Sequence, residues 1–93
     1  MDRLEKQYEI VVRGRVQGVG FRYAARNQAR SLGLKGWVEN QPDASVRTLI
    51  QGSQEACNSY IQWCRMGTAY SWVEQVDIEE KPTSALSRFR ILI

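Results

Sequence analysis

Three glycines and an arginine stand close together near the start of the chain, in a pattern that could bind an anion. Gly14, Gly18 and Gly20 fall within seven residues, and Arg22 follows two residues later. An apolar run precedes them and a helix-like run follows, so the glycines fall where a strand turns into a helix. The first amides of a helix lack partners and carry the positive end of its dipole. Glycine lets a backbone approach a ligand closely, so this stretch predicts a cradle for a phosphate-like anion.

The same glycines could also form only a tight turn, and the residues alone leave both interpretations open. The stretch is not a Walker loop, because no Gly-Lys-Ser/Thr follows, and its spacing differs from the dinucleotide-binding fingerprint. Arg22 would add a planar, permanently charged fork that suits phosphate oxygens. Arg26 and Arg30 follow Arg22 at intervals of four residues, on one face of the predicted helix, and are expected to be solvated.

A second candidate, Asn40, ends a predicted strand beside a turn at residues 41–45. An amide side chain there could accept a hydrogen bond from a water molecule and donate one to an anion. Alternatively, it could only satisfy the backbone of the turn, as asparagine often does.

The composition narrows the chemistry that is available. The chain of 93 residues has no histidine, which removes the commonest general base and metal ligand. Cys57 and Cys64 would lie about 10.5 Å apart along one helix, too far for a disulfide between them. They are predicted to be small buried residues rather than zinc ligands.

The charge distribution favours a small anionic ligand over a nucleic acid. The net charge is +3, and residues 1–47 hold nine of the 13 basic residues but only five of the 10 acidic ones. This excess is too small to indicate a long nucleic-acid footprint. No apolar run approaches the ~18 residues that span a membrane, and residues 1–6 lack the apolar core of a signal peptide. We therefore expect a cytoplasmic protein.

Apolar periodicity predicts one domain with the order βαββαβ and a short extra strand. Residues 1–6 are expected to form a loose lead. The predicted strands are 7–13, 34–40, 46–51, 70–80 and 89–93, and the predicted helices are 21–32 and 54–66. Two helices on one face of an antiparallel sheet would be an economical packing. Three tryptophans are expected to pack in the core or at its rim: Trp37, Trp63 and Trp72.

Two blocks of the sequence resemble the acylphosphatase family. Gly14 to Arg22, GRVQGVGFR, resembles the signature Gly-x-Val-Gln-Gly-Val-x-Phe-Arg at every fixed position. Leu32 to Asn40, LGLKGWVEN, resembles the second block of the family, and the spacing between the blocks also fits. The resemblance implies a single acylphosphatase-like domain over residues 1–93. Its fold would be α+β, a ferredoxin-like split βαβ sandwich with a short extra C-terminal strand.

The resemblance also implies an activity, which is metal-independent hydrolysis of the carboxyl–phosphate bond of small acyl phosphates. The products would be a carboxylate and inorganic phosphate, and no cofactor would be needed. The phosphoryl group would bind the loop amides and the Arg22 side chain, and Asn40 would orient the attacking water. The loop residues in question are Arg15, Val16, Gln17, Gly18, Val19 and Gly20. A monomer is the simplest expectation, and the sequence indicates no pocket for the acyl group.

This sequence departs from the family pattern in two loops. Ala44 stands where the turn after the asparagine usually carries glycine, and a non-glycine residue in the left-handed region costs about 1–2 kcal/mol. We therefore expect Asp43 to take that conformation or the turn to change type. The run Gly67 to Tyr70 replaces prolines that commonly follow the second helix in the family.

Two other functions fit the same fold class. One is a non-catalytic RNA-recognition module, since Val19 to Tyr23 faintly resembles aromatic RNA-binding motifs; those aromatics, however, belong on a central strand rather than at a helix start. The other is a metallochaperone, which would need a cysteine pair in the first loop, where the sequence has none.

Overall fold

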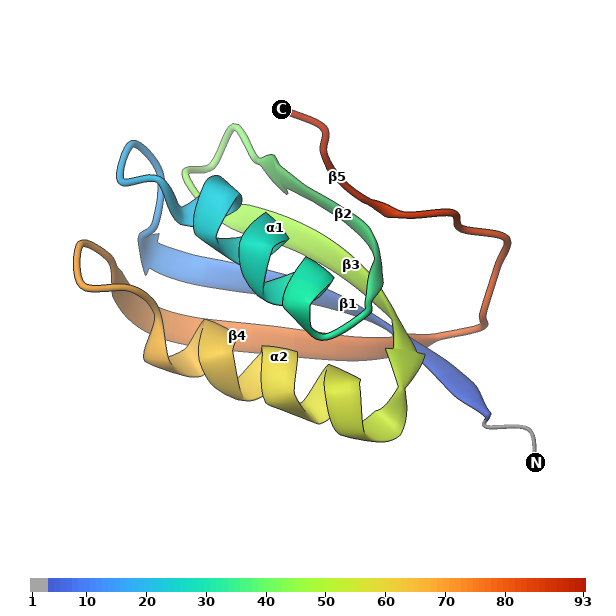
Figure 1. Ribbon diagram of the computed structural model, residues 1–93. Helices are drawn as coiled ribbons and strands as arrows, with labels where there is room; N and C mark the ends of the chain where they lie inside the picture. The colour runs from blue at the N-terminus through green and yellow to red at the C-terminus, as the bar shows by residue number, and fades with distance from the viewer. Residues whose placement is uncertain (1–3) are drawn as a thin grey trace.

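In a computed structural model that describes residues 4–93, five strands form one sheet and two helices pack against it (Figure 1). The elements in chain order are β1 (Glu5–Arg15), α1 (Phe21–Ser31), β2 (Lys35–Asn40), β3 (Val46–Ser53), α2 (Gln54–Met66), β4 (Trp72–Lys81) and β5 (Phe89–Ile91). The predicted βαββαβ order with a short last strand is confirmed. Neither helix is long and apolar enough to cross a membrane.

The sheet has the strand order β4-β1-β3-β2-β5. The four longer strands pair antiparallel, as predicted, and β5 joins the edge beside β2 in parallel. Figure 1 shows both helices on the same face of the sheet. Because β1 lies between β3 and β4, the loop that follows it starts at an inner strand of the sheet.

The strand bounds differ from the predicted ones mainly at the N-terminus. Glu5 and Lys6 were expected to belong to a loose lead, but they pair with Ser53 and Gly52 of β3. This pairing lengthens both strands beyond what alternation of apolar residues could indicate. The prediction of a loose lead is therefore wrong at Glu5 and Lys6. Its part at residues 1–3 lies outside the described residues, and the single domain over residues 1–93 stays a prediction.

The core lies between the sheet and the helices. Ile10 and Val12 of β1 are fully buried there, in one cluster with Phe21 of α1 and Tyr60 of α2. Cys57 and Cys64 are buried and unpaired, as predicted. Burial raises the pKa of the Cys57 thiol to about 11 and that of Cys64 to about 12, so both thiols stay protonated at neutral pH.

One tryptophan does not pack as expected. Trp63 is half-buried, with its ring 5.2 Å from that of Phe21, and Trp37 is also half-buried. Trp72, in contrast, is 68% exposed, which corrects the prediction of a core or rim position. The register of β4 shifts near Gly14, so that Val73 packs against the core and Trp72 does not.

Candidate functional site

The glycine-rich loop joins the end of β1 to the start of α1, as its spacing predicted. Gly18 and Gly20 have φ angles of 74° and 78°, in the left-handed region that glycine adopts without strain. Gly20 is also the N-cap of α1, and no side chain caps the helix there. The loop therefore depends on these two glycines for its shape.

The loop exposes backbone donors that the protein itself leaves unused. Within residues 4–93, no amide of residues 16–20 donates a hydrogen bond to a protein acceptor. The helix ladder begins only with the Ala24 amide, which donates to the Gly20 carbonyl over 3.1 Å. No acidic residue stands in the first turn of α1. These donors and the positive helix end together make a suitable site for an anion.

The side chains of the loop turn away from this site and anchor it. Val16 is almost fully buried, and Val19 packs against the core, so only their backbone is placed to meet a ligand. The side-chain amide of Gln17 donates to the carbonyls of Gln41 and Ser45, at 2.8 and 2.9 Å. Gln17 thus fastens the loop to the turn between β2 and β3. We predicted only a backbone role for Gln17, and no local sequence signal indicates this contact between distant parts of the chain.

The turn between β2 and β3 corrects one expectation. Ala44, and not Asp43, occupies the left-handed region, with a φ of 76°. The Asp43 carboxylate is instead engaged in hydrogen bonds within the turn and with β1. It accepts hydrogen bonds from the hydroxyl and amide of Ser45 and from Arg13. These bonds lower the pKa of Asp43 to about 2.

Asn40 lies at the end of β2, beside the turn that Gln17 contacts. Its backbone amide donates to the Ile93 carbonyl over 2.9 Å, which fixes the end of the strand. Its side-chain oxygen, Oδ1, is buried and has no hydrogen-bond partner within residues 4–93. Buried polar atoms are nearly always paired in native proteins, so an unpaired one calls for a ligand or water. The alternative was that the Asn40 side chain only satisfies the backbone of its own turn. Among the described residues, its Oδ1 atom accepts no hydrogen bond from that backbone.

Arg22 differs from the arginines that follow it on α1. Within residues 4–93, it has no ion pair or side-chain hydrogen bond, and it is half-buried. Arg26 and Arg30 were expected to be solvated, and that is wrong in part. The Nε atom of Arg26 is buried and its guanidinium lies over the Tyr23 ring, whereas Arg30 donates to the Phe89 carbonyl over 2.9 Å.

The placement of Arg22 carries an electrostatic cost that an anion would remove. A cation in the first turn of a helix faces the positive end of the dipole. With the loop amides on one side and no carboxylate in that turn, the local charge is uncompensated. The fold brings Arg22 and the open amides to the same helix start. The roles expected for them and for Asn40 stay predictions.

Three loops meet at this end of the sheet. Figure 1 shows the β1–α1 loop, the β2–β3 turn and the α2–β4 loop there. The hydrogen bonds of Gln17 join the first two loops. The pairing of Arg15 with Trp72 brings the third beside the first. The candidate site is therefore built where segments distant in the sequence converge.

Comparison with known proteins gives concordant results. Residues 8–91 match the family model described as acylphosphatase. An acylphosphatase of Rubrobacter xylanophilus is 41% identical over 86 residues, covering 92% of this chain and 78% of the relative. One from Thiobacillus denitrificans is 44% identical over 75 residues, covering 81% and 84%. The crystal structure of acylphosphatase from Bacillus subtilis superposes with a TM-score of 0.92 at 37% identity, covering 95% of this chain and 99% of that one.

Proposed function

Because the chain belongs to the acylphosphatase family of hydrolases, we propose that it hydrolyses small acyl phosphates without a metal ion. A water molecule attacks phosphorus, a new P–O bond forms, and the bond to the acyl oxygen breaks. The products are a carboxylate and inorganic phosphate. The carboxylate is a good leaving group, so the reaction needs no strong acid catalyst and no histidine.

The observation that carries this proposal is the set of unpaired donors between β1 and α1. The amides of residues 16–20 have no acceptor among the described residues, and Arg22 has no anionic partner there. We propose that the amides from Arg15 to Gly20 hold the phosphoryl oxygens, together with the Arg22 guanidinium. Donors fixed in advance stabilise the charge that spreads over these oxygens in the transition state.

Asn40 is proposed to position the attacking water. Its buried Oδ1 atom, unpaired within residues 4–93, can accept a hydrogen bond from that water. The water must also lose a proton, and a phosphate oxygen of the substrate is the nearest acceptor in this scheme. The role of Asn40 is therefore orientation, and the proton passes to the substrate itself.

The direct test is release of inorganic phosphate from acetyl phosphate in the presence of excess EDTA. We expect turnover well above the spontaneous rate, with no loss when the chelator is added. Failure to accelerate hydrolysis would contradict the proposed function, whereas activity abolished by EDTA and restored by a metal would contradict only its metal independence.

The RNA-binding alternative receives no support from the open face of the sheet. Trp37 lies on β2, an inner strand of the sheet, but the Arg47 guanidinium lies 5.2 Å from its ring centre and covers it. Arg47 is itself paired with Glu9 and Glu39. We retain the small-molecule proposal, with a cytoplasmic monomer as its working assumption; size-exclusion chromatography tests the monomer.

A further inference from the structure

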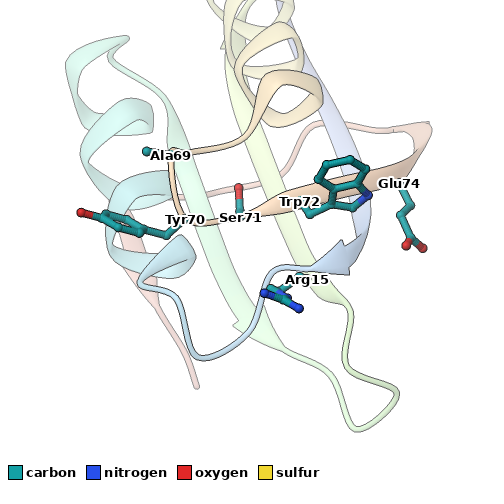
Figure 2. Close-up of a pocket in the computed structure, with 6 residues that line it drawn as sticks. All are labelled: Arg15, Ala69, Tyr70, Ser71, Trp72 and Glu74. Carbon is teal, nitrogen blue, oxygen red and sulfur yellow. The ribbon is translucent and has the colours of Figure 1, made fainter.

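A pocket of about 490 Å³ lies beside the glycine-rich loop, and nothing described so far uses it. It is lined by Arg15 at the end of β1 and by the segment that leads from α2 into β4. The lining residues are Arg15, Ala69, Tyr70, Ser71, Trp72 and Glu74 (Figure 2). Its volume is in the range of pockets that bind small molecules.

Arg15 connects this pocket to the candidate site. It is the last residue of β1, the loop amides begin immediately after it, and its side chain lines the pocket. It also pairs with Trp72 across the sheet. A ligand whose phosphoryl group lay at the Arg15 end of the loop can therefore reach this pocket with its remaining part.

The pocket offers two large aromatic surfaces that the fold does not cover. Tyr70 is 79% exposed and Trp72 is 68% exposed. Figure 2 shows their side chains on either side of Ser71, with Arg15 below them in this view. Exposed aromatic rings that border a site commonly provide contact area for a flat ligand.

The polar groups of the pocket favour a neutral ligand over a charged one. The Ser71 hydroxyl is already engaged, since it accepts from the Thr68 amide and donates to the Thr68 carbonyl. Arg15 and Glu74 carry opposite charges on the same lining, so their fields largely cancel for a group placed between them. Besides these two charged groups, the lining offers the apolar faces of the two rings.

We propose that this pocket binds the acyl group of the substrate and selects acyl phosphates whose acyl group is flat and aromatic. The inference rests on the proposed function and adds a substrate class to it. Trp72 contacts the acyl group, Tyr70 borders the pocket on the other side of Ser71, and Arg15 stands between the acyl group and the phosphoryl group. Neither aromatic side chain takes part in breaking the bond in this proposal.

The test compares benzoyl phosphate with acetyl phosphate in the wild type and in Trp72→Ala, Tyr70→Ala and Ile78→Ala. Ile78 is the matched control, because it is a partly exposed apolar residue of the same strand outside this pocket. We expect Trp72→Ala to lower kcat/KM for benzoyl phosphate about five- to tenfold, mainly through KM, with a smaller loss for Tyr70→Ala. Acetyl phosphate, which is too short to reach the rings, should be hydrolysed equally by all four proteins.

Inhibition by two phosphonates that the enzyme cannot hydrolyse tests binding of the aromatic group separately from turnover of the aromatic substrate. Phenylphosphonate should compete more strongly than methylphosphonate against acetyl phosphate hydrolysis, and Trp72→Ala should remove that advantage. Equal losses for both substrates, or no loss for benzoyl phosphate in either aromatic variant, would overturn the pocket assignment and leave the proposed function intact. A wild type that hydrolyses neither substrate would instead overturn the proposed function, and the pocket assignment with it.

Discussion

The two junctions where a strand leads into a helix differ in how the first amides of the helix are capped. At the β3–α2 junction the helix follows the strand directly, and the Ser53 hydroxyl accepts a hydrogen bond from the Ala56 amide over 3.1 Å. Glu55 adds a negative charge in the first turn. At the β1–α1 junction a loop of five residues intervenes, a glycine stands at the N-cap, and the first turn holds Arg22.

This difference separates a structural helix start from one that is available to a ligand. Side-chain capping and an acidic residue are the ordinary ways to satisfy the first amides of a helix. α2 uses both, so its N-terminus has little left to offer an anion. α1 uses neither and adds a cation, an arrangement that is unfavourable until an anion binds. The five predictions that follow test this contrast.

Arg22→Ala should have the largest effect on activity and almost none on stability. Loss of a fixed donor to the phosphoryl group should lower kcat for acetyl phosphate about 100- to 1,000-fold. Removing a cation from the positive helix end should leave the unfolding free energy unchanged or raise it by up to about 1 kcal/mol. Phosphate release and urea unfolding measure the two effects.

Arg26→Ala is the matched control, one helical turn further along α1. It should retain activity within about twofold of the wild type, because Arg26 is beyond the first turn. If Arg22→Ala is as active as this control, Arg22 does not have the role that we assign to it.

Asn40→Ala should lower kcat about 100-fold while the fold persists, because the attacking water loses its orienting group. Stability should change little, since the side chain has an unpaired buried oxygen that alanine does not. Asn27→Ala, at an exposed position of α1, controls for the loss of an asparagine as such. An Asn40→Ala enzyme with unchanged kcat would remove Asn40 from the mechanism.

Gln17→Glu should affect both activity and stability. The substitution keeps the shape of the side chain but replaces the donating NH₂ group with an acceptor, so the carbonyls of Gln41 and Ser45 lose their partner. We expect a loss of about 1–3 kcal/mol in unfolding free energy and a loss of about tenfold in kcat/KM as the loop loosens. Wild-type values for both quantities would show that this contact does not hold the loop.

Ser53→Ala should lower stability and leave activity unchanged, which is the opposite of the result expected for Arg22→Ala. It removes the cap of α2 and should cost about 1 kcal/mol of stability, with kcat unaffected because this junction binds no substrate. Urea unfolding and the phosphate-release assay measure both. A Ser53→Ala variant that lost activity without losing stability would contradict the division between the two junctions.

Ala44→Gly should have the smallest effect, and it should be favourable. Alanine at a φ of 76° is strained, whereas glycine is not. The gain in unfolding free energy should be about 0.5–1 kcal/mol, since the freer unfolded chain offsets part of the relief. Activity should not change. A variant less stable than the wild type would mean that Ala44 makes a compensating contact.

The sequence was sufficient to predict the element order, α2 and the glycine-rich loop, because each depends on local patterns. Helical spacing identified Cys57 and Tyr60 as buried, and the glycines marked the junction. Contacts between distant segments could not be predicted from these local patterns. The Gln17 hydrogen bonds and the exposure of Trp72 follow from how the strands pair and where β4 shifts register, which no local pattern encodes.

The left-handed residue of the turn at 41–45 was assigned wrongly for a related reason. Asp43 and Ala44 are neighbours in this turn, and either could take the left-handed conformation. Intrinsic preference favours aspartate over alanine in that conformation. The side chain of Asp43 is instead held by Ser45 and Arg13, a contact that fixes its backbone in another region. Local hydrogen bonds from Ser45 and one long-range contact from Arg13 thus accompany a turn that intrinsic preference did not favour.

A titration of the ¹⁵N-labelled protein with inorganic phosphate, followed by amide chemical shifts, tests the central claim most directly. We predict saturable changes in the amides of residues 16–22 and in the Asn40 side chain, with the amides of residues 54–56 at the start of α2 unmoved. Changes at α2 with none in the glycine-rich loop, or no saturable change at either junction, would contradict the account.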